Sequence, residues 1–60
     1  MKNNVVTLTK VVDRYDDRNF YYTVDNKGFK WFFYDLVKAE NFIKSMGARY
    51  EYKEVVTALI

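Results

Sequence analysis

The sequence contains no cysteine and no histidine among its 60 residues. Without cysteine the chain cannot form disulfides or a thiolate metal site, and without histidine it lacks the commonest metal ligand and general base. The carboxylates of Asp13, Asp16 and Asp17 cluster beside a predicted turn, where turn chemistry explains them. The one serine, Ser45, has no histidine to activate it. We therefore expect no enzyme, no metal and no small-molecule cofactor.

The sequence also lacks a long apolar run and a strong charge of either sign. No stretch approaches the roughly 20 apolar residues that span a bilayer. Residues 1–4 lead into a valine-rich run without the apolar core and cleavage site of a secretion signal. The net charge of +2 is too small for a broad nucleic-acid footprint and argues against an acidic mimic of DNA. We expect a cytoplasmic protein that does not contact the membrane.

Aromatic residues are the most abundant feature, at 20% of the chain. With 50% hydrophobic and 30% charged residues, we expect residues 1–60 to form a single small globular domain. A domain of this size buries only about 60% of the surface that its unfolded chain exposes. It has little room to bury so many rings and no disulfide or metal to stabilise it, so self-association or a larger partner is expected.

The first half of the chain predicts a three-stranded antiparallel meander. Residues 5–15 are rich in β-branched Val and Thr, and residues 16–19 then supply a turn of Asp and Asn. A second strand over residues 20–24 leads to a second turn over residues 25–28, which ends in glycine. The almost wholly aromatic residues 29–34 form the third strand, which we place centrally or against a helix.

From Asp35 the apolar period changes to that of an amphipathic helix. Asp35 suits the N-cap, Gly47 suits the position after the helix, and Glu40 can pair with Lys44 one turn later. The apolar stripe has spacings of three and four, and consists of Leu36, Ala39, Ile43 and Met46, widened by Val37 and Phe42.

An alternating run follows the helix and predicts a fourth strand. Tyr50, Tyr52 and Val56 share one face, with Ala58 as a further candidate, whereas Glu54 interrupts that face. Glu51 and Lys53 point to the other side. Residues 55–60 suit either a continued strand or a short helix.

The predicted order is β-β-β-α-β, an α+β fold with one helix packed on one face of a four-stranded sheet. The right-handed crossover through the helix sets the last strand parallel to the first or third, and we favour a place beside the first. The other sheet face then stays open.

Symmetric pairing of the second hairpin about Asn26 and Lys27 separates the aromatic residues into two faces. The face under the helix sets Phe20, Tyr22 and Val24 opposite Phe33, Trp31 and Phe29, and the reverse carries Tyr21, Thr23, Lys30, Phe32 and Tyr34. A bulge at Gly28 would exchange Tyr21 with Tyr22. In the first strand, two alternating sets compete for the inner face: Val5, Thr7, Thr9 and Val11, or Val6, Leu8 and Val12.

The predicted open face suggests a binding site made of Tyr21, Lys30, Phe32 and Tyr34. A fully apolar ring beside Tyr34 and Lys30 makes a contiguous patch of the kind that marks interaction surfaces. We expect a protein partner or a second copy of the chain, as in a homodimer, to bury it. The alternative is a single-stranded nucleic acid, whose bases would stack on these rings.

Overall composition gives one hint of origin. The chain is rich in Lys, Asn, Tyr and Phe and has neither proline nor glutamine, a bias expected of an AT-rich genome. Phages and mobile elements of low-GC bacteria often encode small proteins that bind a host protein and inhibit or redirect it. By this analogy of size, we expect such a viral or mobile-element protein.

Overall fold

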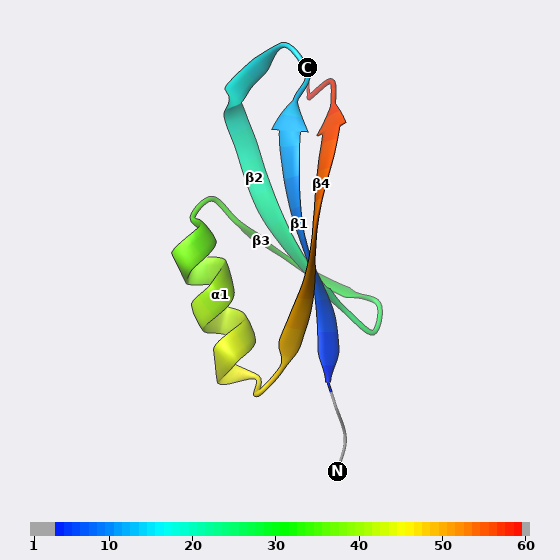
Figure 1. The fold of residues 1–60 in the computed structure, drawn as a ribbon, viewed down its shortest axis with the longest axis vertical. Coiled ribbons are helices and arrows are strands. Elements are labelled where there is room, and N and C mark those ends of the chain that lie inside the picture. Colours follow the sequence, from blue (N-terminus) through cyan, green and yellow to red (C-terminus); the bar gives the residue numbers. More distant parts are fainter. Residues whose placement is uncertain (1–3, 60) are drawn as a thin grey trace.

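The computed structural model describes residues 4–59 and confirms the β-β-β-α-β order of an α+β fold (Figure 1). The elements are β1 (Val5–Asp13), β2 (Asp16–Asn26), β3 (Phe29–Phe33), α1 (Leu36–Ser45) and β4 (Arg49–Thr57). They form a mixed four-stranded sheet in the order β3-β2-β1-β4, with α1 on one face. Residues 1–3, considered above for a secretion signal, and Ile60 lie outside the described residues.

The last strand runs parallel to the first and beside it, as predicted. β4 pairs with β1 from Val5↔Arg49 to Asp13↔Thr57 without a break. Of the run over residues 55–60, the part up to Thr57 is strand, and Ala58 lies beyond the strand's end. The helical alternative for that run is therefore wrong over residues 55–57.

The first hairpin turns earlier than predicted. The chain reverses at Arg14 and Tyr15, and residues 16–19, predicted as the turn, belong to β2. The buried carboxylate of Asp13 explains the difference, because it accepts a hydrogen bond of 3.2 Å from the backbone N–H of Tyr15 and so closes the turn. The pairing of β1 with β2 is irregular at this end, where Asp16 makes the same kind of bond to the backbone two residues on.

The second hairpin turns on Lys27 and Gly28, one residue later than the predicted centre. Both residues have positive φ, 52° and 89°, which is what a two-residue type I′ turn requires. Asn26 therefore pairs with Phe29 and closes the strands. The sequence pattern does not indicate this turn, because lysine seldom adopts a left-handed conformation.

The later turn shifts the predicted pairing by two residues. Tyr22 lies opposite Phe33 and Val24 opposite Trp31, whereas symmetric pairing about residues 26 and 27 sets Tyr22 opposite Trp31. A shift of two leaves every side chain on its predicted face, because the side-chain period of a strand is two. Tyr22 accordingly lies on the helix side, and the exchange with Tyr21 does not occur.

α1 begins and ends where its caps predict. The Asp35 carboxylate accepts a hydrogen bond of 2.8 Å from the backbone N–H of Val37. After the helix, Gly47 has a φ of 68°, and the bonds from Gly47 to Lys44 and from Ala48 to Ile43 form a Schellman motif.

The predicted pair of Glu40 with Lys44 does not form among the described residues. Glu40 instead accepts a hydrogen bond from the Tyr50 hydroxyl. The predicted apolar stripe is also narrower than expected, since Leu36 and Val37 are exposed and Ala39 and Ile43 are buried.

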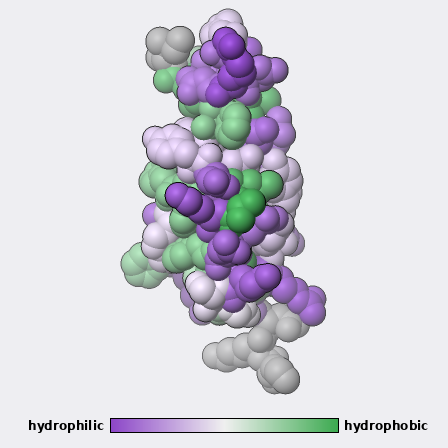
Figure 2. All heavy atoms as spheres, turned by 90° about the vertical axis from the view of Figure 1, so that its left-hand side faces the viewer, coloured by the Kyte–Doolittle hydropathy of each residue, from purple (hydrophilic) through white to green (hydrophobic). Residues whose placement is uncertain are grey.

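The core lies between α1 and the helix-side face of the sheet. Its buried members are Val6, Leu8, Tyr22, Val24, Ala39 and Ile43. The inner set of the first strand is therefore Val6, Leu8 and Val12. Figure 2 views the molecule from the side of α1 and shows mainly hydrophilic side chains there, with hydrophobic ones beside them.

α1 is too short to cover the whole sheet. Ten helical residues span about 15 Å, whereas the molecule is 43 Å long. The end of the sheet with the first hairpin has no helix over it (Figure 1). α1 is also the one helix of residues 4–59, and it has neither the length nor the apolarity to cross a membrane.

β3 is an edge strand, so of the two alternatives given for it, central or against the helix, the second is correct. Its contact with the helix is as predicted, because Trp31 and Phe33 pack on Phe42 with ring centroids 5.0 Å and 5.3 Å apart. These rings belong to the core and not to a binding surface.

Candidate functional site

Three of the four predicted binding residues lie together on the sheet face opposite α1, called here the open face. Tyr21 from β2 and Phe32 from β3 contact each other, with ring centroids 5.8 Å apart at 46°. Lys30 lies two residues from Phe32 on the same strand and therefore on the same face. We call Tyr21, Lys30 and Phe32 the open-face patch.

Phe32 is the exposed centre of the open-face patch. Its side chain is 63% exposed although it is wholly apolar, and it lies opposite Thr23 of β2. Tyr21 is half-buried beside it. The exposed ring thus lies against a second, half-buried aromatic ring.

Short side chains form the floor next to the open-face patch. Thr9 and Thr23 face each other across β1 and β2 and are buried, although no second layer covers this face among residues 4–59. Their neighbours across the strands are Lys53 and Phe32, whose longer side chains are exposed.

Lys30 is partly neutralised by a carboxylate on the neighbouring strand. It lies opposite Asp25, with 3.9 Å between the Lys30 Nζ and the Asp25 Oδ1. Both side chains are about half exposed, and such surface pairs contribute little to stability. The pair gives the open-face patch a polar rim with both signs of charge.

Tyr34, the fourth predicted residue, is not part of this cluster. β3 ends at Phe33, and Tyr34 follows it with a side chain that is 84% exposed. Extending the register would set Tyr34 opposite Tyr21, but the pairing stops one residue short. Tyr34 makes none of the ring contacts found among residues 4–59.

A second uncovered area, which was not predicted from the sequence, lies on the helix side of the sheet, beyond the N-terminal end of α1 (Figure 1). Lys10 lies on this face with its Nζ 4.6 Å from the centroid of the Phe20 ring. Tyr52 and Val56 of β4 are exposed on the same face. A signal was present in the sequence, because Lys10 interrupts the alternating apolar residues of β1.

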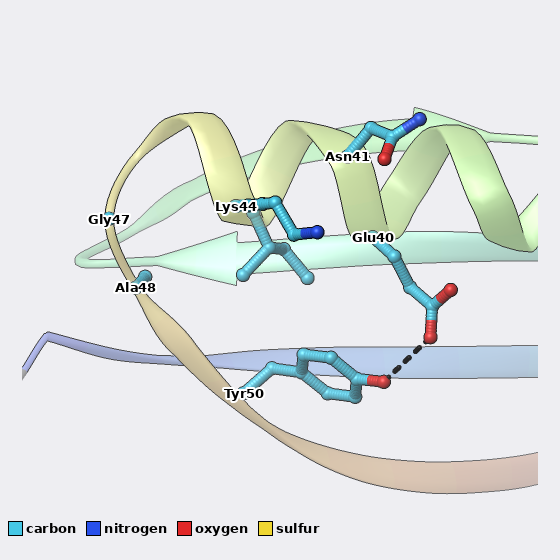
Figure 3. A pocket seen from close by; sticks show the side chains of 7 residues that line it. Glu40, Asn41, Lys44, Gly47, Ala48 and Tyr50 are labelled. Atoms are coloured by element: carbon cyan, nitrogen blue, oxygen red, sulfur yellow. Dashed lines mark hydrogen bonds between the residues drawn. The ribbon is translucent and has the colours of Figure 1, made fainter.

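The helix and the start of β4 enclose a shallow hollow of about 470 Å³. Figure 3 shows Tyr50 pointing across it, where its hydroxyl donates a hydrogen bond of 2.8 Å to the Glu40 carboxylate. This bond, followed by burial and the charge of Glu40, raises the pKa of Tyr50 above its usual 10.0. The hollow brings one carboxylate to one phenol, and its other polar side chains are those of Asn41 and Lys44.

Two acidic residues of the first hairpin, Asp13 and Asp16, accept hydrogen bonds from groups in or next to the turn. Asp13 bonds the backbone of Tyr15 and the amide of Asn19, and Asp16 bonds Arg18. No cluster of three or more potential metal ligands occurs within residues 4–59.

Comparison of the chain with models of protein families, with curated proteins and with solved structures finds no match.

Proposed function

We propose that this protein is a small protein–protein interaction module that docks through the open-face patch. The observation that supports this proposal is the position of Phe32, an apolar ring 63% exposed on a sheet face that α1 does not cover. Its contact with Tyr21 holds it ready for a partner. Contiguous apolar surface of this kind is characteristic of interaction sites.

The chemistry of the patch suits a protein surface. Burying a Phe side chain contributes about 1.5–3 kcal/mol, and aromatic residues are enriched in the centres of protein interfaces. Lys30 and Asp25 at the border supply the polar rim that such interfaces have. Given the composition, a host protein bound by a phage or mobile-element protein is the first partner to test.

Binding of single-stranded nucleic acid is the second candidate, favoured by two neighbouring rings and a lysine on one face. We rank it lower because Asp25 lies beside Lys30, and Glu51 offsets the charge of Lys53 on the same face. Binding of a labelled single strand at low salt would support this candidate if it weakened steeply with salt and was lost with Tyr21→Ala or Lys30→Ala.

The protein-binding proposal is tested with the variant Phe32→Ser. Phe29→Ser is the matched control, because Phe29 lies on the same strand with a similar exposure of 68% but on the opposite face. We expect Phe32→Ser to lose partners that wild type and Phe29→Ser retain in affinity purification, and to bind a purified partner more weakly. Equal recovery and equal affinity for all three chains would remove the open-face patch as the docking surface.

A further inference from the structure

The outer edge of β4 is an unpaired strand edge. β4 pairs with β1 along all nine of its residues, and no strand lies on its other side within residues 4–59 (Figure 1). Its register with β1 contains no bulge, and the chain has no proline to break a further ladder. Proteins usually protect such edges with bulges, prolines or charges, because an open edge pairs with other strands.

Two hydrogen bonds determine which backbone groups of β4 point outward. The Arg49 N–H donates to the Asn4 carbonyl at 2.9 Å, and the Arg14 N–H donates to the Thr57 carbonyl at 2.8 Å. In a parallel ladder alternate residues bond to the same neighbour, so the odd-numbered residues of β4 face β1. The even-numbered residues therefore direct their N–H and C=O groups away from the sheet: Tyr50, Tyr52, Glu54 and Val56.

The side chains of Glu51 and Lys53 protect this edge by charge and are also complementary to each other. Both are exposed on the open face, and neither makes an ion pair within the described residues. Opposite charges directly across two strands are stabilising, and like charges there are destabilising. A strand that pairs with β4 is therefore favoured if it sets a positive charge opposite Glu51 and a negative charge opposite Lys53.

In one register of two β4 strands, Glu51 and Lys53 lie opposite each other. Two copies that pair antiparallel across a two-fold axis make an isologous contact. With Tyr52 on the axis, each Glu51 lies opposite the Lys53 of the other copy, and each Tyr50 lies opposite Glu54. The adjacent registers instead set Glu51 opposite Glu51 or Lys53 opposite Lys53.

We propose that two copies of the chain pair antiparallel through β4 with Tyr52 on the two-fold axis. The two four-stranded sheets then form one continuous sheet of eight strands. The axis is perpendicular to the sheet, so both open-face patches lie on the same side of the dimer. This inference goes beyond the proposed function and does not depend on it, because it uses the edge of β4 and not Phe32.

Charge reversal tests the register, with the dimer measured by analytical ultracentrifugation over a range of concentrations. Glu51→Lys and Lys53→Glu each create two like-charge pairs, so we expect each to raise the dimer dissociation constant about tenfold or more. The double variant Glu51→Lys/Lys53→Glu restores the opposite-charge pairs and should restore dimerisation. Lys38→Glu is the control, since it makes the same charge change on the exposed side of α1.

Cysteine cross-linking locates the axis directly, because the chain has no cysteine of its own. Hydrogen-bonded residues opposite each other in an antiparallel pair have Cα atoms about 5.5 Å apart, within the range of a disulfide. We expect Tyr52→Cys to form a covalent dimer on oxidation and Lys53→Cys to form little.

Three outcomes would overturn the proposal. A chain that stays monomeric at the highest concentration reached leaves the β4 edge to another occupant, such as a strand of a different protein. A dimer that Phe32→Ser breaks and Glu51→Lys does not uses the open-face patch. Cross-linking through position 53 in place of position 52 assigns another register.

Discussion

The hydroxyl of Tyr50 lies 2.8 Å from the Glu40 carboxylate, so that the start of β4 is tied to the middle of α1. The bond needs the proton of the phenol, and the nearby carboxylate disfavours the phenolate. Both effects raise the pKa of Tyr50 in the folded protein above the usual 10.0. The link has consequences at high pH.

The first prediction concerns stability above pH 10. A raised pKa in the folded state contributes stability that is fully present below the unfolded value of 10.0 and is lost as pH rises through the folded value. Wild type should therefore lose stability more steeply than Tyr50→Phe as pH rises past that point. Urea unfolding at a series of pH values measures this, with Tyr34→Phe as the control. Parallel curves for wild type and Tyr50→Phe would contradict it.

A second prediction tests the core beneath α1. Ile43 is buried against the sheet, so Ile43→Val should lower the free energy of unfolding by about 0.5–1.5 kcal/mol. Val37→Ala on the exposed side of the same helix should change it by less than about 0.5 kcal/mol. Denaturant titrations of both variants compare the two sites. Similar losses for both would mean that the helix packs differently.

The third prediction concerns the helix N-cap. Asp35→Ala removes the acceptor for the Val37 N–H and should cost about 1 kcal/mol of stability. Asp35→Asn keeps a side-chain acceptor and should retain most of it. Thermal and chemical unfolding of the pair measure the difference. The cap has no such role if alanine and asparagine give equal stability.

A fourth prediction uses the left-handed conformation of Lys27. Asparagine adopts this conformation more readily than lysine, and Asn-Gly is the preferred type I′ turn. Lys27→Asn should therefore stabilise the protein by on the order of 0.5 kcal/mol. The midpoint of urea unfolding should rise, and a lower midpoint would contradict the turn described here.

Much of the fold follows from the sequence because several local signals agree. Asp35 and Gly47 mark the ends of α1, and a strand after a crossover helix has one favoured handedness. The two faces of the second hairpin were also predictable, because a two-residue shift of register keeps each side chain on its side. For this reason the sequence predicts Tyr21 and Phe32 on the same open face, where their rings are in contact.

Other features depend on single residues that sequence patterns do not settle. The turn at Arg14 and Tyr15 depends on the buried carboxylate of Asp13, whereas the next acidic residues make an equally good turn signal. Tyr34 falls outside the open-face patch because β3 ends one residue before it. The edge position of β3 follows from β4 pairing with β1, as favoured from the sequence, whereas the aromatic content of β3 alone also allowed a central place.

The central claim is that the open-face patch docks a protein, and site-specific photo-cross-linking tests it most directly. A photoreactive phenylalanine analogue is placed at Phe32 or, as the control, at Phe29 on the opposite face of β3. The account predicts one cross-linked partner from position 32, displaced by excess wild-type chain but not by Phe32→Ser, and no such product from position 29. The same product from both positions, or one that Phe32→Ser displaces as well as wild type does, would contradict it.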